Sequence, residues 1–507
     1  MAKSFPKKMI MNSNFDINQR PDFDVVVQQI TDFVLASPPP SAEAYRTARY
    51  CLMDSIGCGL LALQFPECRK LLGPVVEGTT VPNGSRVLGT DFVLDPVKAA
   101  WDIGCIIRWL DFNDTWLAAE WGHPSDNLGA ILSVCDHLSQ VNSRQGIPSL
   151  TVKDVLIAMV QAHEIQGILA LENSFNRVGL DHVLLVRVAS TAVTTRLMGG
   201  NQEQIMAAIS HAWADGGALR TYRHAPNAGS RKSWAAGDAT SRAVALSQIA
   251  MKGEMGIPGV LTARQWGFYD VLFSQWNQNL AAKPLDGRQF RFQREFGCYV
   301  MENILFKLSF PAEFHAQTAC EAAVLLYPQL QGRLHEIQRI IITTHDSAIR
   351  IISKQGELSN PADRDHCLQY MVAVALITGN LTAECYEDDY HRKMPQIDVL
   401  RNKMEIEESQ SYSKDYYDPE KRSIANSVQI LFNDGTSTDH VEIEYPIGHR
   451  RRREEGIPVL VEKFRKNAST CFSSTECDAL ERILLDEDTL EKMPVHLLMN
   501  TLVKSPS

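Results

Sequence analysis

The sequence has few of the signals that specify a disulfide framework or a metal site. Its 11 cysteines are odd in number, and no two of them form a C-x-x-C pair. Zinc sites, iron–sulfur clusters and disulfide scaffolds need closely paired or evenly numbered cysteines. Cys51 and Cys58 share one face of a predicted helix, where reduced thiols behave as small apolar side chains. We therefore expect a reducing compartment and no metal site.

Long apolar runs and an excess of positive charge are also missing. No apolar run approaches the roughly 18–20 residues that span a bilayer, and no G-x-G-x-x-G phosphate loop, internal repeat or low-complexity tract occurs. The 60 acidic residues outnumber the 50 basic ones, which gives a net charge of −10. This balance argues against nucleic-acid and membrane partners. We expect a soluble intracellular globular protein in which an anionic ligand needs a local basic site.

The first 20 residues are predicted to be a flexible tail. They lack the continuous apolar stretch of a secretion signal. Residues 1–15 carry Lys3, Lys7 and Lys8 and no acid, so a short mitochondrial presequence is the alternative, although these residues include no arginine and form no clear amphipathic helix.

Helical periodicity dominates from about residue 22 to about residue 300. Ser41 follows three prolines and is a predicted N-cap for a helix over 41–63, and Thr151 with Asp154 forms a capping box for the next long helix. Further amphipathic helices are predicted over 96–108, 126–140, 181–198, 202–214 and 230–252.

The pattern changes near residue 305. Apolar and polar residues alternate over 335–352, whose centre is rich in β-branched side chains. The same alternation occurs in two runs within 427–445, which are joined by the hairpin turn sequence Asn-Asp-Gly at 433–435. Helices are predicted over 364–378, 456–468, 475–485 and 488–500. The predicted fold class is mainly α: a large all-helical domain (1–300), an inserted smaller α+β lid domain (301–448), and C-terminal helices (449–507) that return to the helical domain.

Candidate chemistry begins with WLDFNDTWLAAEWGHPSDN (109–127), where titratable groups stand among tryptophans. Burial raises carboxylate pKa values and lowers that of histidine, which brings Asp111, Asp114 and His123 toward the range useful for proton transfer. Helix capping by Asp114 and a turn at His123 explain the same residues. A second candidate is His182, which with Asp181 opens an apolar helix where it could donate to an anion; simple packing is the alternative.

A basic stretch and a domain seam supply candidate binding groups. The segment 219–243 carries many cations and one acid, Asp238, and several carboxylates on one small molecule would need such a cluster; a solvated basic face is the alternative. Lys307, Glu313 and His315 stand at the predicted domain seam, where ligands often bind, although a polar linker explains them too. Residues 361–371 could contribute or only cap a helix. The cations of the basic stretch are Arg220, Arg223, His224, Arg231, Lys232 and Arg242.

Several long motifs together resemble the MmgE/PrpD family. They are the 109–127 stretch, AHEIQGILALENSFNRVGLDHVLLV (162–186), LRTYRHAPNAGSRKSWAAGDATSRA (219–243), MENILFKLSFPAEFHAQTA (301–319), NPADRDHCLQYM (360–371) and IEYPIGH (443–449). The similarity runs from about residue 21 to about residue 500. It implies a helical domain with a smaller α+β lid, usually a homodimer, that works without metal or organic cofactor.

The resemblance also implies an active site and a reaction. Its aspartate and threonine fall on Asp111 and Thr115, its histidines on His123 and His182, and its lysine on Lys232. Its lid-junction lysine and histidine fall on Lys307 and His315, where this chain is one residue shorter than many relatives. Lys232 and Arg231 are expected to stabilise the charge of the transition state, and His123 or His182 to act as general acid, with Asp111 orienting a histidine or acting as base. The other carboxylates of a small tricarboxylate substrate are expected to bind Arg220, Arg223 and His224.

The implied reaction removes water from 2-methylcitrate to give 2-methyl-cis-aconitate, a step of the methylcitrate cycle of propionate degradation. Citrate and cis-aconitate are possible further substrates. A cis-aconitate decarboxylase that forms itaconate on the same scaffold is the main alternative; an isomerase of another dicarboxylate and a non-enzymatic scaffold are others. The expected location is the cytoplasm in a bacterium or the mitochondrial matrix in a fungus.

Overall fold

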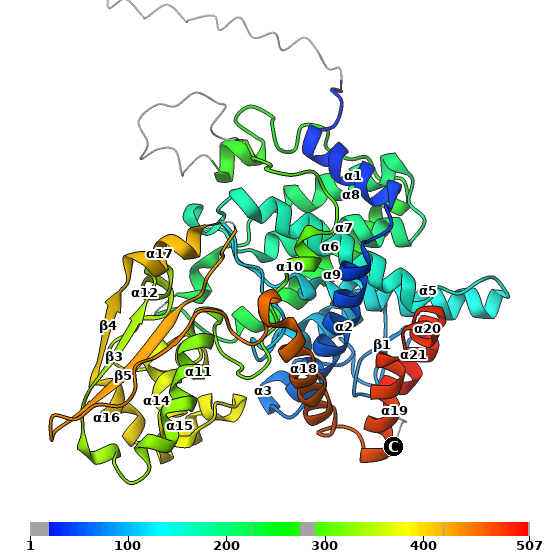
Figure 1. Cartoon of the computed structure of the whole chain (residues 1–507). Helices are drawn as coiled ribbons and strands as arrows, with labels where there is room; N and C mark the ends of the chain where they lie inside the picture. Colours follow the sequence, from blue (N-terminus) through cyan, green and yellow to red (C-terminus); the bar gives the residue numbers. More distant parts are fainter. Residues whose placement is uncertain (1–19, 225, 274–288, 419, 505–507) are drawn as a thin grey trace, which may run out of the picture.

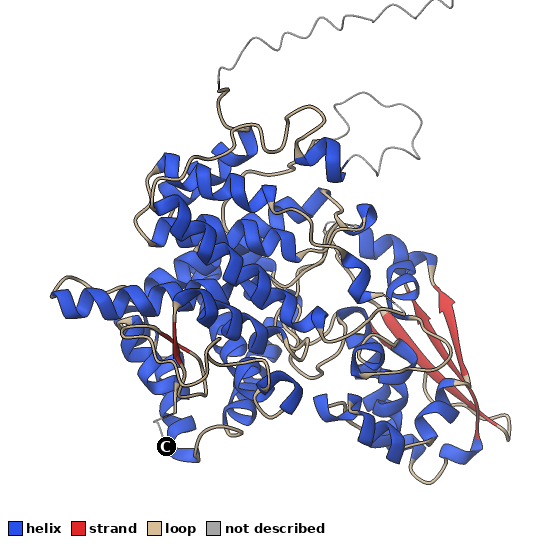
Figure 2. Ribbon diagram, turned by 180° about the vertical axis from the view of Figure 1, so that it is seen from behind, coloured by secondary structure: helices blue, strands red, loops and turns tan. Residues whose placement is uncertain are grey.

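The computed structural model describes residues 20–224, 226–273, 289–418 and 420–504. All but the last residue of the predicted N-terminal tail lies outside these residues. The described chain is mainly helical, with small sheets, as predicted. Figure 1 shows a helical part on the right and a sheet with its own helices on the left, and Figure 2 shows the same arrangement from behind.

The helical part is built from the predicted amphipathic segments. Ser41 accepts from the Ala44 amide and Thr151 forms a capping box with Asp154, so both predicted helix starts are confirmed. The helices are α1 (Val25–Ala36), α2 (Ala42–Ala62), α3 (Pro66–Arg69), α4 (Pro96–Arg108), α5 (Leu128–Gln145), α6 (Val152–Glu172), α7 (Val183–Leu197), α8 (Gln202–Ala214), α9 (Arg231–Met251) and α10 (Tyr299–Asn303). The short turns η1 (Pro124–Asn127), η2 (Asn176–Val178), η3 (Arg220–Arg223) and η4 (Tyr269–Phe273) and the small hairpin β1 (Ser85–Arg86) and β2 (Val93–Leu94) connect them.

Two glycines let helices α4 and α9 approach closely. A Cβ atom at Gly237 would lie 2.3 Å from the Trp101 carbonyl oxygen, and one at Gly104 would lie 2.9 Å from the Gly237 Cα atom. No larger side chain fits between the two backbones. The close crossing places Arg108, at the end of α4, near Lys232, at the start of α9.

Helix α6 is long and apolar enough to pass a test for membrane spans by length and composition. In the structure, 89% of its apolar window is buried inside the protein, and His163 and Glu164 lie in its middle. We interpret it as the central core helix of the helical part, around which the other helices pack.

The second part holds a four-stranded sheet with its own hydrophobic core. The strand order is β4-β3-β5-β6, in which β3 and β4 are parallel and the other pairs are antiparallel. Side chains of α11 and α14 pack with those of β3 and β5 in this core. The elements are β3 (Ile337–Thr344), β4 (Met404–Glu408), β5 (Asn426–Phe432), β6 (Val441–Ile443), α11 (Gln317–Leu326), α12 (Asp346–Ile352), α13 (Pro361–Arg364), α14 (Leu368–Thr378), α15 (Asp388–Lys393), α16 (Gln396–Arg401), α17 (Gln410–Tyr417), η7 (Phe314–Ala316), η8 (Tyr327–Leu330), η9 (Leu334–Glu336) and η10 (Ala383–Tyr386).

The predicted hairpin is present, but the predicted extended run over 335–352 is wrong in its second half. Strand β3 ends at Thr344, and His345 then caps helix α12 by accepting from the Ala348 amide, which ends the alternation. Strand β4 was not predicted. Its partner β3 lies more than 60 residues earlier in the sequence, and such long-range pairing leaves little local signal.

The chain returns to the helical part after residue 449. Side chains of Leu460, Phe464, Leu480 and Leu498 share one hydrophobic core with helices α1–α8. The predicted helix over 488–500 is interrupted, because Pro494 lacks the amide that would continue it. The elements are η11 (Arg450–Arg452), α18 (Arg453–Ala468), α19 (Ser474–Leu485), α20 (Glu487–Lys492) and α21 (Val495–Leu502).

Candidate active site

Asp111 is the carboxylate around which several predicted residues gather. It follows α4 with a φ of 51°, in the left-handed region that non-glycine residues seldom adopt. Its side chain forms an ion pair with Lys307, and Arg108 Nη1 lies 2.8 Å from its Oδ1. Burial would raise the pKa of Asp111, but Arg108 and Lys307 hold it well below its usual range. Asp111 is therefore an ionised carboxylate and a weak base.

His123 faces Asp111 in a defined orientation. Its Nδ1 lies 2.6 Å from the Asp114 carbonyl oxygen and 3.3 Å from Thr115 Oγ1, and its Nε2 lies 3.6 Å from Asp111 Oδ1. Burial and the nearby cations Arg108 and Lys307 hold the pKa of His123 well below its usual range. Because a carbonyl can only accept, the neutral ring carries its proton on Nδ1 and leaves a lone pair on Nε2. The unprotonated Nε2 of His123 is therefore the ring nitrogen that can accept a proton.

Thr115 ties this loop to the segment that carries Lys307. Its backbone amide donates to the Leu305 carbonyl at 2.7 Å, and the Leu305 amide donates back at 3.0 Å. This isolated antiparallel bridge holds two loop segments side by side that are far apart in the sequence. It thereby brings Asp111 and Lys307 into contact. Both side chains are almost fully buried, at 3% and 1% exposure.

A buried network that the sequence did not predict lies behind His123. His163 Nε2 is 2.9 Å from Asp114 Oδ2, and Ser125 Oγ donates to Asp114 Oδ1 at 2.7 Å. Cys51 Sγ lies 3.6 Å from Asp114 Oδ2. Cys51, Asp114 and His163 are also the one group of three ligand-type residues close enough to hold a metal ion among the residues described. Their hydrogen bonds fix the backbone of Asp114, whose carbonyl orients His123.

His182 lies against His123 at the start of α7. The ring centroids are 5.5 Å apart, and both ring nitrogens of His182 are buried without a hydrogen-bond partner among the described residues. A Cβ atom at Gly122 would lie 3.1 Å from the His182 ring, so the glycine permits this approach. Burial, and then Arg223 and Arg220, lower the pKa of His182 well below its usual range despite Asp181. The imidazole is neutral; its Nδ1 lies 3.4 Å from Asp181 Oδ1, and its Nε2 is free to bind a ligand.

Arg223 and Arg220 flank His182 through its neighbour Asp181. Arg223 forms an ion pair with Asp181, and Arg220 Nη1 lies 4.0 Å from Asp181 Oδ2 and 3.7 Å from Glu120 Oε1. The Arg220 guanidinium also lies 5.3 Å from the Trp121 ring centroid. Both arginines are buried, at 8% and 7% exposure, so two residues of the predicted basic cluster face inward.

Lys232 joins the two parts of the molecule. It lies in the first turn of α9, pairs with Asp365 and has its Nζ 3.0 Å from His366 Nδ1. His366 Nε2 lies 3.9 Å from Asp111 Oδ2, so the His366 ring lies between Lys232 and Asp111 and links them. Burial lowers the pKa of Lys232, although Asp365 and Asp111 favour its charge. Residues 361–371, for which helix capping was the alternative, therefore also bring a histidine and an aspartate to the site.

Buried acids next to the arginines do not fully neutralise them. Burial raises the pKa of Glu120 to about 7 despite Arg220, and that of Asp126 to about 7 despite Arg108. Near neutral pH each acid is partly protonated, so Glu120 neutralises the charge of Arg220 only in part, and Asp126 adds little to the ion pair of Arg108 with Asp111. The site can therefore bind a small polyanion while it keeps two neutral histidines beside it.

Two predicted binding residues, Arg231 and His224, face solvent in this structure. The Arg231 side chain is 46% exposed, lies 3.7 Å from Asp238 and stacks over the Trp234 ring. His224 is exposed at the end of η3. On a helix, successive residues point about 100° apart, so the burial of Lys232 turns Arg231 toward solvent.

His315 is buried next to the cluster rather than in its centre. Its Nδ1 lies 2.8 Å from Glu313 Oε1 and its Nε2 lies 2.9 Å from Tyr416 Oη. Burial alone would raise the pKa of Glu313, but His315 and more distant cations lower it to about 2. The pair connects the site to the sheet part, and a direct role of His315 in substrate binding stays a prediction.

Sequence reasoning missed Arg108, His366 and Lys463. Arg108 and Lys463 occur in amphipathic helices, where a basic residue normally faces solvent, and nothing local distinguishes them. His366 stood in a motif that helix capping explained equally well. A signal for Lys463 could have come only from its three-dimensional neighbours: Asp54, and the backbone of Phe112 and Lys307.

Comparison with known families gives two matches that together cover most of the chain. Residues 28–281 match the MmgE/PrpD N-terminal domain, and residues 310–488 match the MmgE/PrpD C-terminal domain. The first match holds Asp111, His123, His182 and Lys232, and the second holds Asp365 and His366.

Curated relatives match over almost their whole length. A protein of Escherichia coli named 2-methylcitrate dehydratase is 57% identical over 482 residues, which cover 94% of this chain and 97% of the relative. One of the same name from Cupriavidus necator is 58% identical, with 96% and 98% covered. The mitochondrial 2-methylcitrate dehydratase of Yarrowia lipolytica is 56% identical, with 93% and 89% covered.

Proposed function

This chain belongs to the MmgE/PrpD family, and from that premise we infer that it catalyses the dehydration of 2-methylcitrate. It is a hydro-lyase that removes water from 2-methylcitrate to give 2-methyl-cis-aconitate. The observation that carries the proposed site is the convergence of Asp111, His123, His182 and Lys232, from three separate stretches of sequence, on one buried cluster.

The cations are proposed to bind the three carboxylates and to stabilise the charge that develops on one of them. A proton next to a carboxylate is weakly acidic, so its removal needs cations near the enediolate-like transition state. Lys232 and Lys307 are placed to supply this charge, with Arg108 beside them. Arg220 and Arg223 then bind the remaining carboxylates, in a buried site where charge–charge interactions are strong.

His123 is proposed to accept the substrate proton through Nε2. Asp111 Oδ1 is engaged by Lys307 and Arg108, and we assign this carboxylate to orient His123 and Lys307. His182 is proposed to protonate the departing hydroxyl. A bound trianion would raise the pKa of His182 by offsetting Arg220 and Arg223, so the ring could then carry the proton it donates.

The sheet part is proposed to act as a lid. Asp365 and His366 belong to it and reach Lys232 of the helical part, and Asn360 donates to the Ala228 carbonyl at 3.2 Å across the same junction. Because the cluster is buried, opening of this junction would admit the substrate and closing it would exclude water. The proposal includes the homodimer and the bacterial cytoplasm or fungal mitochondrial matrix expected from the family resemblance.

An ultraviolet assay for unsaturated acids tests the activity with 2-methylcitrate, citrate and cis-aconitate in parallel. We expect the fastest formation of an unsaturated product from 2-methylcitrate, without carbon dioxide release. Itaconate and carbon dioxide from cis-aconitate would instead identify a decarboxylase. Dialysis against a strong chelator should leave the rate unchanged; a loss that added metal restores would show a metal requirement, for which Cys51, Asp114 and His163 are the candidate ligands.

The pH profile of kcat/KM should extend to unusually low pH. Burial and cations lower the pKa of both histidines in the free enzyme, so the basic form of His123 persists as the pH falls through the ordinary histidine value of about 6.5. We therefore expect the acidic limb of the profile, which reports His123, to lie below this value, and a decline toward higher pH as His182 loses the proton that it donates; both are measured with 2-methylcitrate from pH 5 to 9. A midpoint at or above about 6.5 would exclude His123 as the base described here.

A further inference from the structure

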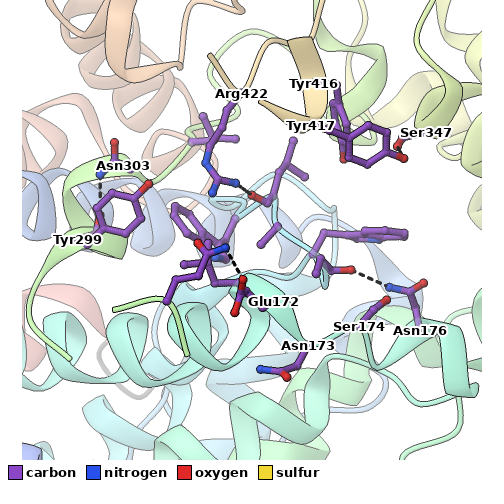
Figure 3. A pocket seen from close by; sticks show the side chains of 18 of the residues that line it. Glu172, Asn173, Ser174, Asn176, Tyr299, Asn303, Ser347, Tyr416, Tyr417 and Arg422 are labelled. Atoms are coloured by element: carbon purple, nitrogen blue, oxygen red, sulfur yellow. Dashed lines mark hydrogen bonds between the residues drawn. The ribbon is translucent and has the colours of Figure 1, made fainter. Parts of the chain in front are cut away.

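A cavity of about 940 Å³ lies between the two parts of the molecule, and its volume is within the range of small-molecule sites. Figure 3 shows side chains of both parts around it, among them Asn173 and Tyr299 from the helical part and Ser347 and Tyr416 from the sheet part. The cavity is distinct from the candidate active site, because Asp111, His123, His182 and Lys232 do not line it. Trp121 lines the cavity while Arg220 lies over its ring.

The lining is strongly cationic in a chain of net charge −10. It includes several arginines that form no ion pair with a carboxylate among the described residues. Glu172, one of the few acids in the lining, accepts a hydrogen bond from Gln293. Unpaired guanidinium groups repel one another, so a multiply charged anion would bind between them favourably. These arginines are Arg291, Arg294, Arg350, Arg422 and Arg451.

Arg422 has features of a built binding site rather than of a solvated surface. Its Nη1 donates to the Leu117 carbonyl at 2.9 Å, which fixes the side chain across the junction. Its Nε atom is buried and has no hydrogen-bond partner in the described part of the chain. Its φ of 44° is in the left-handed region, and such backbone strain persists mainly at functional positions.

We propose that this cavity is a second anion site, which binds a small molecule with at least two phosphate or carboxylate groups. Guanidinium groups contact both kinds of group in the same bidentate manner. Arg291 and Arg294 come from the helical part and Arg350 and Arg422 from the sheet part, so a bound polyanion bridges the two. It is also next to Tyr416, whose hydroxyl group contacts His315. The proposal does not depend on the identity of the substrate.

Calorimetric titration of the full chain with tripolyphosphate and, separately, with tricarballylate tests this site. We compare the wild type with the double variant Arg294→Gln/Arg350→Gln and with the control Arg144→Gln/Arg392→Gln, which removes the same charge at exposed positions elsewhere. We expect one tripolyphosphate or tricarballylate per chain at the cavity, in addition to any that binds at the candidate active site around Lys232. The cavity-bound probe should bind at least tenfold more weakly in the cavity variant and equally well in the control. The probe that binds with the higher affinity identifies phosphate or carboxylate as the preferred ligand group.

Two results would overturn the proposal. Equal weakening in the cavity variant and the control would indicate general attraction to positive charge. Competitive inhibition of 2-methylcitrate turnover by the bound probe, together with a higher KM in the cavity variant, would make the cavity the approach path of the substrate. Turnover of the cavity variant without added anion should equal that of the wild type, and circular dichroism verifies its fold. A complete lack of turnover in the wild type would contradict the dehydratase and leave the binding result intact.

Discussion

Replacing Lys232 with alanine is expected to lower kcat for 2-methylcitrate by about 10²–10³-fold, the loss typical when one preorganised group that stabilises transition-state charge is removed. The ammonium group lies in the buried cluster, beside Asp365 and His366. The fold should survive, because the alanine replaces a helix residue with a better helix former and Asp365 keeps its contact with His366. Steady-state kinetics and the thermal midpoint measure the two effects separately.

The neighbouring substitution Arg231→Ala is the matched control. It removes the same charge one residue away, but the Arg231 side chain is exposed and lies over Trp234. We expect kcat and KM near the wild-type values. If Arg231→Ala were as inactive as Lys232→Ala, the site would extend to the outer face of α9 and would include Arg231, as the sequence predicted.

Replacing Lys463 with methionine is expected to destabilise the protein by about 3–5 kcal/mol, because it leaves a buried charge without its partner. Lys463 Nζ lies 2.6 Å from Asp54 Oδ1 and donates to the carbonyls of Phe112 at 2.8 Å and Lys307 at 2.7 Å. These carbonyls belong to the segments that carry Asp111 and Lys307. Denaturant unfolding should show the loss, and kcat should fall by about 10²-fold as the catalytic groups shift.

The pH dependence and a double variant separate the two roles of Lys463. Burial raises the pKa of Asp54 to about 6 even beside Lys463. A carboxyl group with a raised pKa binds more protons in the folded protein than in the unfolded protein, so the free energy of unfolding falls as the pH rises. Loss of Lys463 removes the charge that lowers the pKa of Asp54, so it strengthens this effect. The Lys463→Met defect should therefore be larger at pH 8 than at pH 5.

The variant Lys463→Met/Asp54→Asn should recover most of the lost stability, because no uncompensated charge is then buried. Its activity should stay low, since the Phe112 and Lys307 carbonyls still lack their donor. Full recovery of kcat in the double variant would show that Lys463 has only a structural role and does not position the site.

The sequence determined the helices and the segments that hold the chemistry. Their signals are local: the cap at Ser41, the capping box at Thr151 and the 3.6-residue periodicity depend on residues a few positions apart. The hairpin at 433–435 is equally local, because its turn requires particular residues. Family membership could likewise be predicted, because long motifs can be recognised in the sequence without knowing where they lie in the folded protein.

The tertiary structure alone decided which members of those segments meet. Arg231 and Lys232 are adjacent cations in the sequence, and only the packing of α9 against α4 turns one outward and buries the other. His366 became a site residue because the sheet part lies against Lys232. Parallel pairing of β4 and the contact of Lys463 with Phe112 join segments far apart in the chain. A sequence records the local preferences of each segment, whereas the burial and charge that set the chemistry of a site arise only from neighbours brought together by folding.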